Sequence, residues 1–208
     1  MSHDAMNLID ADDTRMIDLP GVGPCPRPVD IDQRVTGFKR LKSLRIYRFV
    51  PGPAIHGDSE TDEVFILPLS GAFDMQITGA HPLTARVSAF GPTRALYMPP
   101  GHSYLLTPRS TVTVAYARAE AKGRVATQPV AETDCGGLAE HLRYRLVQAK
   151  AGQHLVPGWG GETFVHVVEG ALNWAEGRID QGQTLALVKA EAAPLQAHTD
   201  TSLLIIGV

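Results

Sequence analysis

The sequence repeats one pattern in its two halves, and this repeat constrains the fold more than any other feature. Glu63 opens the nine-residue run EVFILPLSG, which ends at Gly71, and Glu162 opens the matching run ETFVHVVEG, which ends at Gly170. In each copy the glutamate stands eight residues before the glycine. A repeat of roughly 90 residues is far longer than a solenoid unit. It therefore favours a small domain that has been duplicated.

Short β-strand patterns fill both copies. Phe73, Met75 and Ile77 alternate with other residues, and a β-branched run covers residues 111–117. The 20 glycines and 15 prolines predict many turns. Short strands at regular spacing are typical of a sandwich or a barrel, so we expect an all-β protein.

Composition divides the chain into four predicted parts. Residues 1–36 combine acids with a proline-rich stretch and are predicted to form an N-terminal extended arm, since proline restrains the backbone to extended geometry. Residues 37–121 form the first β domain, and residues 141–208 form the second, shorter one. The glycine-containing segment 122–140 has few large apolar residues and is predicted to be a linker.

Charge and cysteine content exclude several classes of function. The formal net charge of −3 leaves no basic surplus to bind phosphates, so we expect no nucleic-acid partner. No apolar run reaches the ~18 residues of a membrane span, and the N-terminus lacks the basic and apolar parts of a secretion signal. We therefore expect no membrane contact and a cytoplasmic location. Cys25 and Cys135 lie far apart, which excludes a disulfide framework and a cysteine-based zinc site.

Two motifs resemble those of the cupins. A glycine followed by His56, Asp58, Glu63 and Gly71 resembles the first cupin motif, and residues 97–104, YMPPGHSY, resemble the second. Two such halves resemble a bicupin. This resemblance implies two tandem antiparallel jelly-roll barrels that follow the N-terminal arm. It also implies a homodimer, because cupins often pair through strand edges and N-terminal arms.

Residues from about 38 to 121 are similar to 5-deoxy-glucuronate isomerase. The similarity lies in Val64–Gly71, in Ala95–Gly101 and in the closing residues 114–119. It implies an isomerase that acts on a small sugar acid with one divalent metal, which would be Zn, Ni, Mn or Fe. That family builds its metal site in the C-terminal half from a His-x-His pair, a glutamate and a later histidine. Here His154 is followed by Leu155 and Val156, so the second histidine of the pair is missing.

The first half offers one candidate metal site, composed of His56, Asp58, Glu63 and His102. Side chains alternate along an extended segment, so His56 and Asp58 share one side. A divalent metal takes three or four nitrogen or oxygen ligands from converging strands. Glu63 and Tyr104, which stands where the second motif has its histidine, are the candidate catalytic residues. Alternatively, His56 and Asp58 lie in solvent and the site has been lost.

The second half offers an alternative metal set of His154, Glu162 and His166. Glu162 and His166 are four residues apart on one predicted strand and therefore share a face. Alternatively, His166 makes only local hydrogen bonds in a half-buried strand. Trp159 and Trp174 flank this set and are candidates for stacking on a sugar ring, although core packing is the alternative for both.

Two functions from different classes follow. The first is a metal-dependent isomerase of a small sugar acid, in which a glutamate or histidine moves a proton between adjacent carbons. The second is a catalytically silent bicupin with no cofactor, which binds a small molecule or acts as an oligomeric scaffold. The two functions differ in one structural feature: the metal-dependent isomerase requires three ligating side chains that converge in one barrel, and the silent bicupin does not.

Overall fold

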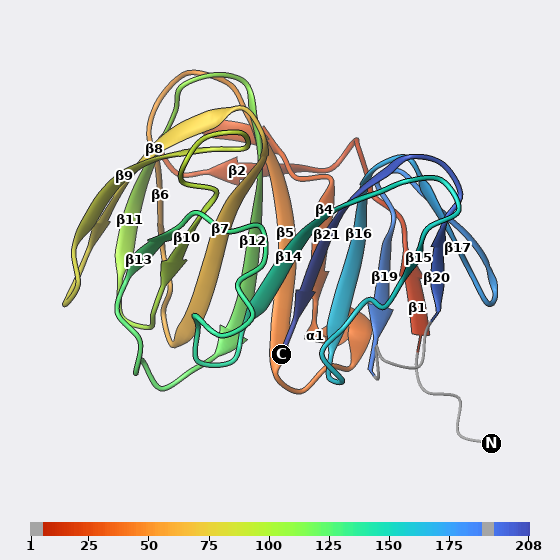
Figure 1. Ribbon diagram of the computed structural model, residues 1–208. Helices are drawn as coiled ribbons and strands as arrows, with labels where there is room; N and C mark the ends of the chain where they lie inside the picture. Colours follow the sequence, from red (N-terminus) through yellow and green to blue (C-terminus); the bar gives the residue numbers. More distant parts are fainter. Residues whose placement is uncertain (1–5, 189–193) are drawn as a thin grey trace.

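The computed structural model describes residues 6–188 and 194–208 of the chain (Figure 1). These residues form antiparallel strands and one short helix, α1 (Gln33–Thr36), so the expected all-β class is confirmed. No helix in these two ranges has the length and apolar character needed to cross a membrane.

The first half of the chain forms a large sheet and a small one. The large sheet has the order β13 (Gln128–Val130), β10 (Ala95–Met98), β7 (Asp62–Ser70), β12 (Val112–Glu120), β5 (Leu41–Phe49), β4 (Val29–Asp32). The small sheet has the order β6 (Ile55–Asp58), β11 (Ser103–Pro108), β8 (Ala72–Thr78), β9 (Leu83–Ser88).

The second half repeats this plan. Its large sheet has the order β1 (Met6–Ile9), β19 (Thr184–Leu187), β16 (Thr163–Glu169), β21 (Thr201–Gly207), β14 (Arg143–Ala149). Its small sheet has the order β15 (His154–Leu155), β20 (Leu195–Ala197), β17 (Ala171–Trp174), β18 (Gly177–Asp180). Strands β5 to β12 thus correspond one by one to strands β14 to β21, and the repeat in the sequence is a repeat of strand order.

The glycines that end the two repeated runs are required by the turns that follow them. Gly71 has a φ of 71°, and a Cβ atom there would lie 2.3 Å from the Thr111 carbonyl oxygen. Gly170 has a φ of 85°, and its Cβ atom would lie 2.4 Å from the Asp200 carbonyl oxygen. Only glycine accepts both the left-handed backbone and the close approach.

Alternation along the central strands supplies three separate cores. On β7, Val64 and Ile66 point into the inner core of the first half, between its large and small sheets. Phe65 and its neighbour Leu67 point the other way, into a central core between the two large sheets. On β16 the same alternation sends Val165 and Val167 to the inner core of the second half and Phe164 to the central core.

The central core joins the two halves, whose large sheets meet in the middle of Figure 1. Phe38 packs on Phe164 with ring centroids 5.2 Å apart. Phe65 meets Tyr144 edge-on at 4.9 Å. Aromatic pairs of this geometry add to the apolar area that they bury. The two halves therefore form one packed unit.

Both inner cores are filled with apolar side chains. In the first half Phe73, Met75 and Leu106 are fully buried, and the hairpin of β2 (Met16–Leu19) and β3 (Gly23–Pro26) covers this core. In the second half the fully buried residues include Leu172, Ile179 and Leu195.

The N-terminal segment contacts both halves. Strand β1 pairs with β19 at the edge of the second half, whereas β4 pairs with β5 in the first half. Between them the chain crosses from one half to the other and forms the β2–β3 hairpin, whose strand β2 is labelled in the upper part of Figure 1. The segment therefore covers the seam between the halves.

Candidate functional site

The two repeated glutamates, Glu63 and Glu162, accept hydrogen bonds from backbone N–H groups and do not join the metal sets predicted for them. Glu63 is fully buried and accepts the backbone N–H groups of residues 140, 141 and 142 at 2.9, 2.8 and 2.5 Å. It also accepts the Tyr97 hydroxyl at 3.0 Å. Glu162 accepts the N–H groups of Lys39, Arg40 and Leu41, the last two at 2.8 and 2.7 Å. Each carboxylate thereby holds the segment that leads into the first strand of the other half.

The first predicted metal set is not brought together. Glu63 shares the face of Phe65 and points toward the other half, away from the inner core. His56 and Asp58 do share one side of β6, but both side chains are exposed there, whereas Ile55 at the start of the strand is buried. The alternation was therefore predicted correctly, and the shared side faces solvent.

His102 and Tyr104 have separate surroundings. The Nδ1–H of His102 donates to the Pro100 carbonyl oxygen at 2.9 Å, and its Nε2 accepts the His81 N–H at 3.1 Å. Tyr104 lies over Gly57, where a Cβ atom would approach its hydroxyl to 2.3 Å. Burial raises the pKa of Tyr104 to about 12, so its hydroxyl stays protonated at neutral pH.

The second predicted set is also dispersed. His154 is exposed on β15, Glu162 holds the backbone of the first half, and His166 is buried on β16. Trp159 packs against Gly207 and lies under the Arg145 guanidinium, 5.1 Å from its ring centroid. Trp174 packs against the inner core of the second half.

A metal ion does not fit the residues of either set. In the described part of the chain, no three His, Cys, Asp or Glu side chains come together as a metal site. Both ring nitrogens of His102 already have hydrogen-bond partners, and the carboxylates of Glu63 and Glu162 are held by backbone N–H groups. No step of a mechanism can be assigned to a metal at these positions.

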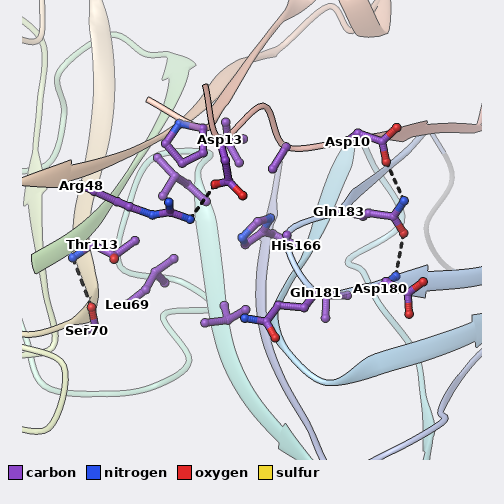
Figure 2. A pocket seen from close by; sticks show the side chains of 17 residues that line it. Asp10, Asp13, Arg48, Leu69, Ser70, Thr113, His166, Asp180, Gln181 and Gln183 are labelled. Atoms are coloured by element: carbon purple, nitrogen blue, oxygen red, sulfur yellow. Dashed lines mark hydrogen bonds and ion pairs between the residues drawn. The ribbon is translucent and has the colours of Figure 1, made fainter. Parts of the chain in front are cut away.

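A pocket of about 810 Å³ lies between the two halves (Figure 2). One wall comes from β5, β7 and β12, and the opposite wall comes from β16 and the turn before β19. The N-terminal segment contributes Asp10 and Asp13 at the rim. The other polar side chains of the lining are Arg48, Ser70, Thr113, His166, Asp180, Gln181 and Gln183.

His166 is the buried titratable group of this pocket. Its Nδ1 lies 3.0 Å from the Thr184 hydroxyl oxygen, which fixes the ring. Its Nε2 has no hydrogen-bond partner within residues 6–188 and 194–208, and the residue lines the pocket. Burial lowers the pKa of His166 to about 4, so the imidazole is neutral at physiological pH. A neutral imidazole can exchange a hydrogen bond with a ligand hydroxyl.

Arg48 supplies the positive charge of the lining. It extends from β5, and its Nη2 pairs with the Asp13 carboxylate at 2.8 Å. On the other side Gln183 donates to Asp10 at 2.6 Å and accepts the Asp180 N–H at 2.6 Å. The pocket thus combines one guanidinium with carboxylates, amides and a neutral imidazole.

The sequence indicates His166 only as a candidate metal ligand, and it does not indicate Arg48 or Asp13 at all. In the sequence alone RFV at Arg48 aligns with RLV at Arg145, which indicates a strand in each half. Strand pairing corrects this alignment, because Arg48 lies opposite Thr113 whereas Arg145 lies opposite Ile205 and is the counterpart of Arg45. The structure gives the two arginines different surroundings, since Arg145 lies over Trp159 whereas Arg48 faces the pocket. No local signal in the sequence connects residue 13 with residue 48.

The model of one protein family matches residues 27–139, which is more than half of the 208 residues. That model describes the KduI/IolB family. This chain belongs to the KduI/IolB family. The match confirms the resemblance of the first half to the isomerase family, and it covers Arg48 but not His166. No curated protein matches the sequence of this KduI/IolB-family chain.

Solved structures with a similar fold cover nearly the whole chain. The pirin YhhW from Escherichia coli, in complex with nickel(II), has a TM-score of 0.72 at 12% identity, covering 98% of this chain and 99% of its own. A putative glyoxylate-induced protein from Pseudomonas aeruginosa has a TM-score of 0.75 at 13% identity, covering 99% and 90%. A variant of oxalate decarboxylase from Bacillus subtilis has a TM-score of 0.73 at 9% identity, covering 100% and 78%. These similarities show that the KduI/IolB-family chain has a cupin-like fold.

Proposed function

We propose that this chain binds a small sugar acid in the pocket between its two halves. The observation that carries the proposal is that Arg48 and His166, one from each half, face the same pocket. A guanidinium is well suited to a carboxylate, because its N–H groups form a planar fork. The Nε2 of His166, which has no hydrogen-bond partner in the described part of the chain, is available to a hydroxyl group.

The remaining lining suits the hydroxyl groups of a sugar. Asp180 offers acceptor oxygens, and the Gln181 amide offers both a donor and an acceptor. The volume of about 810 Å³ lies within the range of roughly 300 to 1,000 Å³ that is usual for ligand pockets. The two inner cores are filled with apolar side chains, so a polar ligand is better accommodated between the halves.

The binding proposal is tested by calorimetric titration of the protein with D-glucuronate. Arg48→Ala removes the carboxylate partner and is expected to weaken binding at least tenfold. Arg45→Ala is the matched control, because Arg45 lies on the same strand but faces Asp30 outside the pocket. Equal binding by the two variants would refute the proposal.

A second candidate function is isomerisation of a sugar acid, and membership of the KduI/IolB family favours it. Such a reaction removes a proton from one carbon of the sugar and returns a proton to the adjacent carbon. His166 is the residue of the pocket that is placed to exchange a proton through Nε2. Incubation with sugar acids in D₂O, followed by NMR, tests this function. Conversion with deuterium incorporation, lost in His166→Gln, is the expected result for an isomerase, whereas binding without conversion identifies a silent binder.

We further propose that each half is a jelly-roll barrel and that the chain is therefore a bicupin. The one-to-one correspondence of β5–β12 with β14–β21 supports this description, as do the two separate inner cores. The predicted boundaries at residues 36, 121 and 140 stay predictions. A homodimer of the 22.4-kDa chain also stays a prediction, and light scattering in solution checks it.

A further inference from the structure

We infer that the Asp13 side chain competes with acidic ligands for Arg48. In the free protein its carboxylate occupies the place at Arg48 that the carboxylate of a ligand would take, and an acidic ligand binds by displacing it. The inference rests on the proposed function, since it concerns the same pocket. It adds a specificity-determining residue from the N-terminal segment.

The position of Asp13 is set independently of Arg48. Asp12 donates its backbone N–H to the Pro28 carbonyl oxygen at 2.8 Å, and its carboxylate accepts the Thr14 N–H at 3.0 Å. Arg15 closes the turn by donating its backbone N–H to the Asp12 carbonyl oxygen at 3.1 Å. The turn therefore keeps its place when the Asp13 side chain leaves Arg48.

The ion pair between Asp13 and Arg48 is easily replaced by another carboxylate at Arg48. The two side chains are 69% and 51% exposed, and exposed ion pairs contribute little to stability. The ion pair joins Nη2 of the guanidinium to Oδ1 of Asp13. A free carboxylate can approach the same guanidinium in the bidentate geometry, which is stronger. An acidic ligand therefore has a better contact to offer than the one that it replaces.

Asp10 provides a contrast within the same segment. It also stands at the rim of the pocket, but its carboxylate accepts from Gln183 in the second half rather than from Arg48. Asp10→Asn removes the same charge from the rim and leaves the pair of Arg48 and Asp13 in place. A comparison of Asp13→Asn with Asp10→Asn therefore separates competition for Arg48 from the general effect of removing a negative charge near the pocket.

Internal competition predicts a selective effect on acidic ligands. In Asp13→Asn the guanidinium is free, so the affinity for D-glucuronate is expected to rise about two- to fivefold, the range that corresponds to an exposed ion pair. The neutral analogue D-glucuronamide does not compete for a carboxylate subsite, and its affinity is expected to stay unchanged.

Calorimetric titration of the wild-type chain, Asp13→Asn and Asp10→Asn with both ligands tests the inference. A gain confined to Asp13→Asn and to D-glucuronate supports it. An unchanged or weaker affinity of Asp13→Asn for D-glucuronate overturns it, as does an equal gain in Asp10→Asn, and in both cases the proposed function stands. Absence of D-glucuronate binding in all three proteins contradicts the proposed function itself and removes the inference with it.

Discussion

Glu63 and Glu162 stand at equivalent positions of the two halves, and each binds the backbone of the other half. Glu63 accepts three N–H groups from the segment before β14, and Glu162 accepts three from the first residue of β5 and the two residues before it. The two contacts are reciprocal, so the halves are held together by the same interaction used twice. A residue that resembles a metal ligand in the motif thus acts as a clamp between the halves.

The clamp predicts a large loss of stability in Glu63→Ala. Its removal leaves three backbone N–H groups of residues 140–142 without their acceptor in a buried site. We expect the free energy of unfolding to fall by about 3 kcal/mol or more, because hydrogen bonds to a charged group are strong and buried donors are costly to orphan. Urea unfolding measures the change. The exposed Glu169 supplies the control variant Glu169→Ala, and equal midpoints for the two variants would show that Glu63 is not a clamp.

His166 predicts a loss of stability as the pH falls. Its pKa is about 4 in the folded chain, below the ordinary value of 6.5, because burial disfavours the charged form. The unfolded chain therefore takes up the proton first, and the stabilisation that is present above pH 6.5 is lost as the pH falls toward 4. Between pH 7 and pH 5 the contribution of this group amounts to about 2 kcal/mol.

The free energy of unfolding of the wild-type chain and of His166→Gln is measured by urea unfolding at pH 7, 6 and 5, and the two pH profiles are compared. Glutamine does not titrate, so its stability is expected to fall less steeply over this interval. Parallel pH profiles of the two proteins would mean that His166 is not held neutral.

The turn after β16 predicts that Gly170→Ala is strongly destabilising. Gly170 has a φ of 85°, and an added Cβ atom would collide with the Asp200 carbonyl oxygen. We expect a loss of about 2 kcal/mol or more in the free energy of unfolding. Gly137→Ala is the control, because no atom lies within 4 Å of a Cβ atom at that position. A similar thermal midpoint for both variants would contradict the account of this turn.

Burial of the two thiols predicts that they are unreactive in the folded chain. Cys25 and Cys135 are both buried and free. Burial raises the pKa of Cys135 to about 12 and also raises the pKa of Cys25. Since the thiolate is the reactive form, a disulfide reagent such as DTNB is expected to modify neither residue at pH 8 until denaturant is added. Rapid reaction of one thiol in the native protein would contradict this expectation.

The sequence was sufficient for the strands and for the repeat. Alternation in residues 73–77 predicted β8, and the glycines at 71 and 170 marked the ends of two equivalent strands. These features depend on local geometry, which a short stretch of sequence determines.

Which face of a central strand points to the inner core and which to the central core could not be predicted in the same way. The run from Val64 to Leu69 is apolar throughout, because both faces of β7 are buried, one in the inner core and one in the central core. Such a run carries no signal for which face is which. The sequence therefore placed Glu63 in a metal site, whereas the structure directs it to the other half.

The pocket between the halves depends on contacts between distant residues. Asp13, Arg48 and His166 come from three separate segments. The packing of the two large sheets brings Arg48 and His166 to one cavity, and the crossing of the N-terminal segment adds Asp13. No spacing in the chain encodes that arrangement.

The central claim is that a sugar acid binds between the halves, and histidine side-chain NMR during titration with D-glucuronate tests it most directly. The ring signals of His166, assigned with His166→Gln, are expected to shift in a saturable manner in the wild-type chain and to stay fixed in Arg48→Ala. The exposed His56 and His154 serve as internal references that do not move. Saturable shifts at those references with an unchanged His166 would contradict the claim, since they would place the ligand outside the pocket.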